Sequence, residues 1–459
     1  MTDTLTDAPA DQARTSDEGA IARFLKATEL DTRMLGMVGA LVLIWLGFHG
    51  LSGMTGGSYN PITLIWNFVE GLSRGLFLTP RNLWNLSVQS SSVAIMATGM
   101  VLVIVTRNID LSVGSLLGFV GMIMGVTQAE FLPQMLGIPL GHPSVWIIAL
   151  VAGMIVGVGI GAFQGMLIAY AGIPAFIVTL GGLLVWRGAA WWVTSGRTVA
   201  PMDTTFRLMG GGPAGSIGAT WSWIVALIGC LGVILLLLSA RRQRLRFKFP
   251  LRPIWAEVLL AAVSCAVILG AVWVANSYPW PIGIVRRYYE AQGLEVPEGA
   301  FIAHGIAIPV LMAIVVGVVM TFITTRTRFG RYVFAIGGNP EAALLAGINV
   351  RWVTVKIFML MGLLVSISAA VSTARLNAAT NAMGTLDELL VIAAAVIGGT
   401  SLSGGVGTVA GAMLGAVLMQ SLATGMILLG VDTPLQNIVV GAVLVVAVWL
   451  DTIYRSRIK

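Results

Sequence analysis

Charged residues are scarce in this chain. Of its 459 residues, 57% are hydrophobic and only 10% are charged, whereas a soluble globular domain carries roughly 25% charged residues. This scarcity excludes an ordinary soluble domain. The hydrophobic residues come in runs of about twenty, the length of helix that crosses a bilayer core of roughly 30 Å. Because a chain in lipid must satisfy its backbone hydrogen bonds internally, such runs are expected to be helices.

The residues that usually carry catalysis or bind metals are also few. The two cysteines, Cys230 and Cys265, lie inside apolar runs, and the three histidines (His49, His142 and His304) are far apart in the sequence. This spacing fits neither a disulfide framework nor a metal site. No lysine follows a glycine, so the chain has no P-loop with which to cradle nucleotide phosphates. These absences argue against an enzyme and predict no cofactor and no metal.

Ionisable side chains are rare within the apolar runs. Asp110, Arg375, Asp387 and Glu388 fall at the ends of runs, and only Arg187 is expected to lie deep in one. Carriers coupled to protons or sodium usually place carboxylates inside the membrane. A transporter with this sequence would therefore draw its energy from elsewhere, although a channel would show the same pattern.

Twelve apolar segments follow one another along the chain. They cover residues 35–54, 86–106, 111–129, 145–170, 174–195, 221–240, 255–276, 305–325, 353–375, 387–400, 406–429 and 434–452. The segment at 387–400 is short, and the glycine-rich stretch after it predicts a broken or re-entrant helix. We therefore expect an all-α integral membrane protein, a polytopic bundle of about 10–12 transmembrane segments.

The basic residues gather between or after the apolar segments, at 241–248, 326–356 and 455–459. By the positive-inside rule these stretches, and both chain termini with them, lie in the cytoplasm. Topology thus accounts for the net charge of +7, and no nucleic-acid partner is expected. Residues 1–33 are polar without an apolar run. They are expected to form a disordered cytoplasmic tail with a short helix near Phe24 and Leu25, ahead of a transmembrane domain at 34–455.

A first polar motif, TRNIDLSVGS at 106–115, links two apolar segments. Asp110 is placed to cap the N-terminus of the following helix, where a carboxylate meets the positive end of the helix dipole. Gly114 allows close packing of helices. The residues leave two roles open, a capped helical hairpin and a direct part in transport.

A second polar motif, AIGGNPEAALLAGI at 335–348, lies in the basic loop at 326–352. Asn339 before Pro340 predicts an N-cap with proline at the first helical position. Glu341 favours the first turn, and Gly347 is a typical C-terminal stop. The motif therefore predicts one short helix of about seven residues, too short to be stable alone. Such a helix either docks into a groove of a soluble partner or packs on its own domain.

Polar residues inside the apolar segments are candidates for a translocation path. The candidates are Gln89, Ser90, Ser91, Ser92, Thr179 and Arg187. Side chains of this kind either line a path or form hydrogen bonds with neighbouring helices.

Two further stretches, PAFIVTL at 174–180 and VIGGTSLSGGVG at 396–407, join the two polar motifs in a recognisable order. From about residue 35 onward, the chain resembles the ribose/xylose/arabinose family of ABC-transporter permeases. Its length and the arginine-rich loop at 241–252 look most like the D-xylose-type permeases. The long N-terminal tail and the segment at 277–304, which looks like an insertion in an outer loop, depart from the family pattern.

The resemblance implies a membrane-spanning permease subunit, without enzymatic activity of its own, in the bacterial inner membrane. It would translocate a monosaccharide, D-xylose or another pentose, delivered by a periplasmic sugar-binding protein. Two ABC-type ATPase subunits would drive a homodimer of this chain. Contact with the ATPase is expected at Gly338, Asn339, Pro340, Glu341, Ala342, Ala343 and Gly347. Structural hinges or caps are expected at Asp110, Gly114, Gly398, Gly399, Gly404 and Gly405.

Overall fold

The computed structural model describes residues 24–25, 27–29, 31–54 and 61–456. Most of the predicted tail at 1–33 lies outside these residues. In its described part, Phe24, Leu25, Ala27 and Thr28 are helical, which agrees with the short helix expected there.

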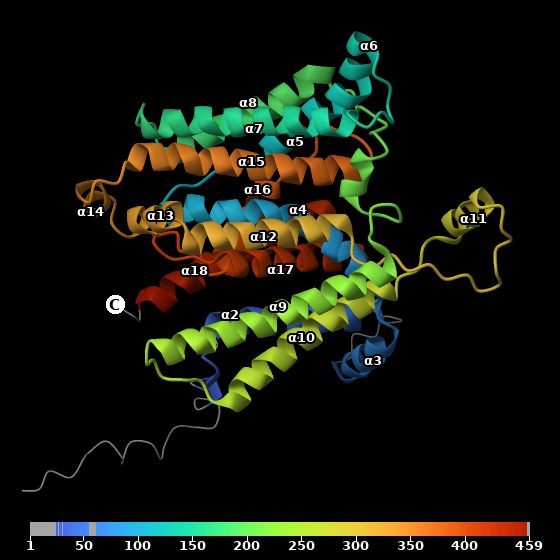
Figure 1. Ribbon diagram of the computed structural model, residues 1–459, viewed down its shortest axis with the longest axis horizontal. Coiled ribbons are helices and arrows are strands. Elements are labelled where there is room, and N and C mark those ends of the chain that lie inside the picture. Colours follow the sequence, from blue (N-terminus) through green and yellow to red (C-terminus); the bar gives the residue numbers. More distant parts are fainter. Residues whose placement is uncertain (1–23, 26, 30, 55–60, 457–459) are drawn as a thin grey trace, which may run out of the picture. The chain divides into compact units, whose positions relative to one another are not determined.

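Helices make up most of the described chain (Figure 1). They are α2 (Thr32–Ser52), α3 (Pro61–Arg74), α4 (Pro80–Val105), α5 (Val113–Val126), α6 (Leu132–Leu136), α7 (Val145–Ala169), α8 (Ala175–Thr194), α9 (Gly218–Arg246), α10 (Ile254–Asn276), α11 (Ile282–Ala291), α12 (Ile308–Arg326), α13 (Arg328–Gly338), α14 (Pro340–Leu345), α15 (Val350–Leu376), α16 (Asp387–Ile397), α17 (Val409–Leu428) and α18 (Thr433–Ser456). A π-helical turn at Thr127–Phe131 joins α5 to α6, and a 3-10 turn occupies Phe206–Gly210. In the described ranges, extended pairing is limited to isolated bridges, so the predicted all-α fold is confirmed.

Each of the twelve apolar segments lies mainly in a helix, and ten helices of the described chain are long and apolar enough to cross a membrane. The predicted polytopic membrane protein is therefore confirmed. The segment at 387–400 forms α16, which has 11 residues. At 1.5 Å per residue this helix is about 16 Å long, roughly half of what a crossing needs. Its shortness agrees with the expected broken helix.

The chain divides into two compact units. The first comprises the residues up to Gly36 together with Trp223–Ala271, and so contains most of α9 and α10. Within it, the carboxylate of Glu29 accepts hydrogen bonds from Arg244 at 2.6 Å and Arg252 at 2.8 Å. These guanidinium groups lower the pKa of Glu29 to about 2. They attach the short N-terminal helical turn to the end of α9 and to the segment that follows it.

The second unit comprises Met37–Ser222 and Val272–Lys459, and α4 and α15 form its centre. In the most apolar stretch of each helix, 89% of α4 and 78% of α15 are buried, against 17% of α8. Glycines let the backbones meet: a Cβ on Gly157 of α7 would lie 2.6 Å from the carbonyl oxygen of Gly362 in α15. Helices α4 and α15 are thus surrounded by protein, whereas the outer helices present apolar side chains to lipid.

The two ends of the second unit carry different elements (Figure 1). Helices α13 and α14 and the C-terminal end of α18 lie at one end, and α6 and α11 lie at the other. The basic segment at 326–352 was expected to hold one short helix, but it contains α13 as well as α14. The segment at 277–304, which was expected to be an insertion in an outer loop, contains α11. Helix α3 was not expected at all.

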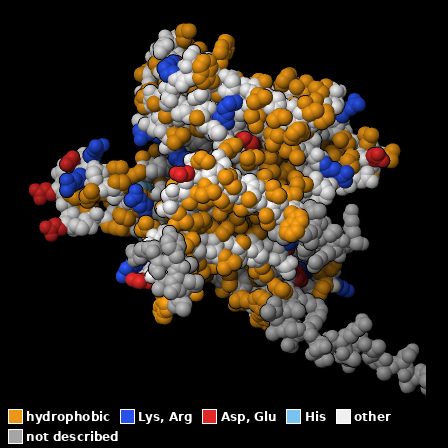
Figure 2. Space-filling view, turned by 180° about the vertical axis from the view of Figure 1, so that it is seen from behind, with side chains coloured by type: hydrophobic (Ala, Val, Ile, Leu, Met, Phe, Trp, Pro, Cys, Tyr) orange, Lys and Arg blue, Asp and Glu red, His pale blue; other side chains and the backbone are white. Residues whose placement is uncertain are grey.

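The surface agrees with a membrane-embedded bundle. In Figure 2, hydrophobic side chains cover much of the visible face, and most of the charged side chains lie toward its edges. Large apolar residues are far more exposed than in a soluble protein; Leu43 is 72%, Leu184 69% and Trp192 79% exposed. Contiguous apolar surface of this extent is stable against lipid and costly in water.

Candidate functional site

The main sequence motifs meet at the end of the second unit that holds α13 and α14. The Arg107 side chain, from the link after α4, donates Nε to the carbonyl of Gly337 at 3.1 Å and Nη2 to that of Gly338 at 2.9 Å. The amide of Gly405 donates to the carbonyl of Val105 at 3.0 Å. The link at 106–112, the end of α13 and the glycine turn at 398–407 therefore form one connected structure.

Glycine is required where these segments touch. Gly404 has a φ of +89°, and a Cβ there would lie 2.7 Å from both the carbonyl oxygen of Gly337 and Cγ of Arg107. A Cβ on Gly405, with a φ of +77°, would lie 3.2 Å from Cα of Gly338. Any larger residue would push the glycine turn away from α13, because the atoms it meets are mainly backbone.

Helix α14 is built as the sequence predicts. Asn339 is its N-cap, with Oδ1 accepting from the amide of Ala342 at 3.0 Å, and Pro340 is the first helical residue. At the other end Gly347 has a φ of +81°. Its amide donates to the carbonyl of Leu344 at 3.0 Å, and the amide of Ile348 donates to that of Ala343 at 3.1 Å. This pair of bonds is a Schellman motif, so both ends of the six-residue helix are closed.

One side of α14 faces the protein and the other is open. Ala343 is only 4% exposed, whereas Leu344 is 64% and Leu345 is 89% exposed. Glu341 and Ala342 are also exposed. The helix is thus held by its caps and one small buried side chain, and it presents two leucines outward.

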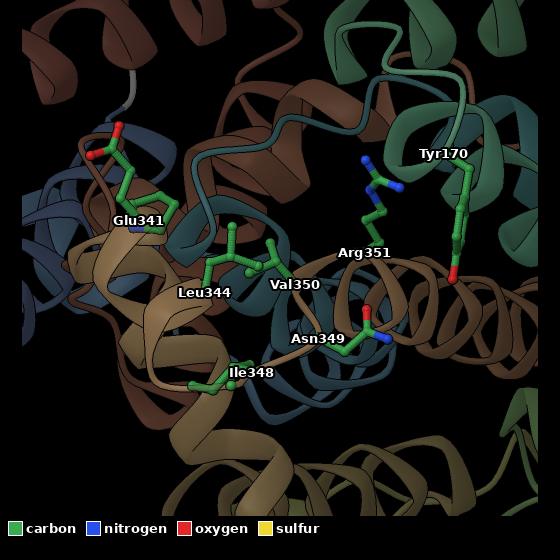
Figure 3. A pocket seen from close by; sticks show the side chains of 9 residues that line it. Tyr170, Glu341, Leu344, Ile348, Asn349, Val350 and Arg351 are labelled. Atoms are coloured by element: carbon green, nitrogen blue, oxygen red, sulfur yellow. The ribbon is translucent and has the colours of Figure 1, made fainter.

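A pocket of about 710 Å³ lies beside α14 (Figure 3). Its lining includes Glu341 and Leu344 from α14 and Asn349 and Arg351 at the start of α15. Tyr170, at the end of α7, lies below the guanidinium of Arg351, whose carbon is 6.0 Å from the ring centre. A smaller pocket of about 360 Å³ adjoins the N-terminal end of α14, and its lining includes Arg107 and Glu341. Two hollows therefore adjoin α14.

The link at 106–112 differs from the prediction in one respect. Ser112, not Asp110, is the N-cap of α5. Asp110 is 2% exposed, and its Oδ1 accepts from the amide of Ser112 at 2.9 Å and its hydroxyl at 2.7 Å. Asp110 therefore closes an Asx turn ahead of the helix instead of capping it. Burial raises the pKa of this carboxyl. The Ser112 hydroxyl in turn accepts a hydrogen bond of 3.1 Å from Nε2 of Gln164 in α7.

The other predicted hinge residues lie around α16. A Cβ on Gly114 would collide with Glu388 and with the carbonyl of Gly384, so α5 and the start of α16 are in direct contact. Gly398 is the C-cap of α16, where a Cβ would meet the backbone of Gly411 in α17. Gly399 has a φ of +88° and faces open space. These glycines permit a short buried helix between α4, α5 and α17.

The predicted path residues fall into two groups. Gln89 of α4 accepts a hydrogen bond from Gln420 of α17 at 3.0 Å. Ser92, one turn deeper, has its hydroxyl 2.6 Å from that of Ser368 and 3.0 Å from that of Ser372 in α15. These residues form a polar stripe between α4, α15 and α17.

The other four predicted path residues donate hydrogen bonds to backbone carbonyls. Ser90 and Ser91 donate to the carbonyls of Leu86 and Ser87 in their own helix. Thr179 is fully buried and donates to the carbonyls of Ala175 and Ile109. Arg187 donates to the carbonyls of Asn381 and Met383 at 2.8 Å and Gly384 at 3.1 Å. Arg187 thereby fixes the segment before α16.

Several contributors were not identified from the sequence. Arg107 was only part of a motif, and its contact with α13 joins residues that are 230 positions apart. Four other residues are isolated polar side chains in apolar helices: Gln164, Gln420, Ser368 and Ser372. Their polarity was the one sequence feature that could have indicated a role. In the described part of the chain, no group of three or more His, Cys, Asp or Glu residues is placed to hold a metal ion.

The chain matches the protein family described as branched-chain amino acid transport system permease component over residues 82–448. It is 36% identical to the xylose transport system permease protein of Escherichia coli (strain K12) over 396 residues, 86% of this chain and 91% of that protein. The xylose transport system permease protein of Haemophilus influenzae is also 36% identical, over 86% of this chain and 95% of its own length. The ribose import permease protein of Escherichia coli (strain K12) is 31% identical over 82% of this chain and 87% of its own length.

No solved structure matches the chain. The family match covers most of the sequence. The three relatives are named as permeases, and the alignments cover nearly their whole lengths. The bundle of apolar helices is a membrane protein of the same kind. The chain therefore belongs to the ABC-transporter permease family that its motifs resemble, as the membrane-spanning component of a transport system.

Proposed function

We propose that this chain is the permease of an ATP-driven importer that translocates a monosaccharide, D-xylose or another pentose. The family description names branched-chain amino acids. The relatives that align over most of their length are instead named for xylose and ribose. The proposal follows the relatives that align over nearly their full length, because both sugars named for them are pentoses.

The exposed, doubly capped helix α14 is the observation that carries the coupling mechanism. Isolated helices shorter than about 12–15 residues are marginal in water, yet this one is fixed by Asn339 and by the turn at Gly347. An exposed pair such as Leu344 and Leu345, flanked by hollows, is typical of a surface that a partner covers. The partner proposed here is the ABC-type ATPase, contacted through Gly338, Asn339, Pro340, Glu341, Ala342, Ala343 and Gly347.

Motion at α14 has a defined route into the bundle. Gly338 directly precedes Asn339, and its carbonyl is bonded to Arg107 at the end of the buried helix α4. Val105 of α4 is in turn bonded to Gly405, in the turn between α16 and α17. An ATPase that moves α14 would therefore move α4, α16 and α17 with it. ATP would favour one arrangement of the bundle, and the hinges would be Gly114, Gly398, Gly399, Gly404 and Gly405.

The arrangement of charge sets the proposed orientation. Arg326, Arg328, Arg331 and Arg351 belong to the segment around α13 and α14, which places that end in the cytoplasm by the positive-inside rule. Both termini are proposed to be cytoplasmic, in the bacterial inner membrane. A periplasmic sugar-binding protein would then deliver substrate at the opposite end, and two copies of the chain would match two ATPase subunits.

The proposed translocation path includes fewer residues than the sequence predicts. Gln89 and Ser92 belong to the polar stripe with Gln420, Ser368 and Ser372. Ser90, Ser91, Thr179 and Arg187 are engaged with backbone carbonyls. We assign these four a structural role and keep Gln89 and Ser92 as path residues.

Co-purification from native membranes tests the proposal. The tagged chain, isolated in a mild detergent, is expected to bring an ABC-type ATPase with it in equal amount. Changing Glu341 to Lys together with Leu345 to Glu is expected to remove that ATPase without loss of the folded permease. A wild-type preparation that contains no ATPase, but takes up pentose in response to a proton gradient, would indicate a self-sufficient carrier instead.

A further inference from the structure

A third pocket opens at the end of the second unit that lies away from α14. Its volume is about 590 Å³, within the range of about 300–1,000 Å³ that small-molecule sites occupy. Its walls come from the start of α4, the segment at 204–214, the end of α15 and the insertion at 277–304. None of the coupling motifs contributes to it.

The lining has the chemistry of a sugar site. Asn85, Gln89 and Asn377 supply side-chain amides, each of which can donate and accept hydrogen bonds. Arg207 and Arg375 add guanidinium donors, and no lining residue among those described is acidic. A monosaccharide presents hydroxyl groups around a ring, so it needs a mixture of donors and acceptors of this kind.

Two tryptophans, Trp84 and Trp280, also line the pocket. A flat indole suits the apolar C–H face of a sugar ring, since aromatic side chains combine a large apolar area with few rotatable bonds. Trp84 is held in place by a hydrogen bond of 2.8 Å from Nε1 to the carbonyl of Gly305. The pocket therefore combines apolar faces with polar groups that could fix the orientation of a bound ring.

Hydrogen bonds and ring contacts at the base of the insertion at 277–304 hold Trp280 at the pocket. The amide of Trp280 donates to the carbonyl of Ile302 at 2.7 Å, and that of His304 donates to Tyr278 at 3.0 Å. The rings of Tyr278 and His304 stack at 4.3 Å, and His304 lies 4.8 Å from the ring of Trp84. The base of the insertion is thus paired and packs on Trp84 of α4.

The pocket leads into the polar stripe. Asn85 and Gln89 are one helical turn apart on α4, and Gln89 is bonded to Gln420 deeper in the bundle. Ser92 continues the same side of the helix toward Ser368. A sugar that leaves the pocket would therefore meet hydrogen-bonding groups before the apolar core.

We propose that this pocket is a receiving site, which binds a neutral monosaccharide on the permease itself before it enters the path. The proposal rests on sugar being the transported substrate. It assigns binding roles to Arg207, Asn377 and Trp280, and it gives the insertion at 277–304 the function of forming one wall of the site.

The test measures binding to the permease without its delivery protein. The purified full-length chain in nanodiscs is examined by saturation-transfer NMR with D-xylose, and Arg207→Ala and Trp280→Ala are compared with wild type. Each variant is expected to weaken saturable binding about tenfold or more, as the loss of a ligand contact usually does. Arg286→Ala, in the same insertion but outside the pocket, and Trp192→Ala, on the exposed side of α8, serve as controls and are expected to bind as wild type does.

The outcomes separate this inference from the proposed function. If the complete transporter imports D-xylose while the permease alone shows no saturable binding, or while Arg207→Ala and Trp280→Ala bind normally, the receiving site is refuted and the importer stands. Stronger binding of D-xylonate than of D-xylose would also refute a neutral-sugar site, because Arg207 and Arg375 would then be binding an anion. If the complete transporter imports no pentose, the proposed function itself fails.

Discussion

The guanidinium of Arg107 donates a hydrogen bond of 2.9 Å to the carbonyl oxygen of Gly338, the residue that directly precedes the cap of α14. Its Nε donates to the carbonyl oxygen of Gly337 at 3.1 Å. We call this pair of hydrogen bonds the Arg107 fork. A charged donor makes these bonds stronger than neutral ones. They join the segment directly after the deeply buried helix α4 to the residues directly before the cap of the exposed helix α14.

Breaking this fork should separate ATP hydrolysis from uptake. Arg107→Ala is expected to leave the transporter assembled and hydrolysing ATP but to reduce pentose uptake about tenfold or more, because motion of α14 would no longer reach α4. Arg107→Lys keeps the charge but cannot form the fork, so it should be intermediate. Uptake and hydrolysis are measured together in proteoliposomes.

Arg328→Ala is the matched control for this experiment, since Arg328 is an exposed arginine at the start of α13. It should behave as wild type does. Unchanged uptake by Arg107→Ala would remove the connection from the mechanism.

Gly347 provides a second test of α14. Its φ of +81° is unfavourable for most side chains, by about 1–2 kcal/mol, whereas asparagine tolerates it. Gly347→Arg is expected to distort the end of the helix and abolish coupled uptake, while Gly347→Asn should retain most of it. Equal activity of the two variants would show that the geometry of this turn does not matter for coupling.

Asp110 should matter for stability more than for coupling. Asp110→Ala leaves the buried amide and hydroxyl of Ser112 without their acceptor, which costs about 1–3 kcal/mol. Asp110→Asn retains an oxygen that can accept both bonds, so it should be much milder. Thermal unfolding in detergent compares the two. A stable Asp110→Ala variant that fails to transport would instead give Asp110 a direct part in transport.

The buried ring of His304 is expected to make the end of the second unit that lies away from α14 sensitive to acid. Burial lowers the pKa of His304 below its ordinary value of 6.5. Its Nδ1 donates to the carbonyl of Tyr278 at 3.1 Å, which a neutral ring can do. A group that is neutral when folded and has a depressed pKa contributes its full stability above about pH 6.5. That contribution is lost as the pH falls through the folded pKa.

Thermal unfolding across this range tests the effect. From about pH 8 to about pH 5 the wild-type melting temperature is expected to fall more than that of His304→Phe, which keeps the ring but cannot titrate. Parallel curves for the two proteins would show that another group is responsible.

The sequence was most informative where local chemistry decides the structure. The caps at Asn339 and Gly347 define α14, and apolar runs of sufficient length define the membrane-spanning helices. The short apolar run at 387–400 was enough to predict an incomplete helix.

Prediction was weaker where distant contacts decide. Helix α4 begins at Pro80, before the apolar run that starts at residue 86, because Trp84 is buried against Tyr278 and His304. Asp110 was expected to cap the helix after it, but its side chain instead accepts hydrogen bonds from Ser112, two residues away. The fork at Arg107 joins segments that no local pattern could bring together.

Uptake of D-xylose by the purified transporter tests the central claim most directly. The wild-type complex, Leu345→Glu and Met135→Glu are reconstituted into proteoliposomes with ATP inside and the sugar-binding protein outside. Met135 is a matched control, because it is an apolar side chain that is 74% exposed in α6, at the other end of the second unit. Wild type and Met135→Glu are expected to take up sugar only when ATP is present and regardless of a protonophore, whereas Leu345→Glu should not take it up. Uptake by Leu345→Glu at the wild-type rate, or wild-type uptake that needs a proton gradient and no ATP, would contradict the account.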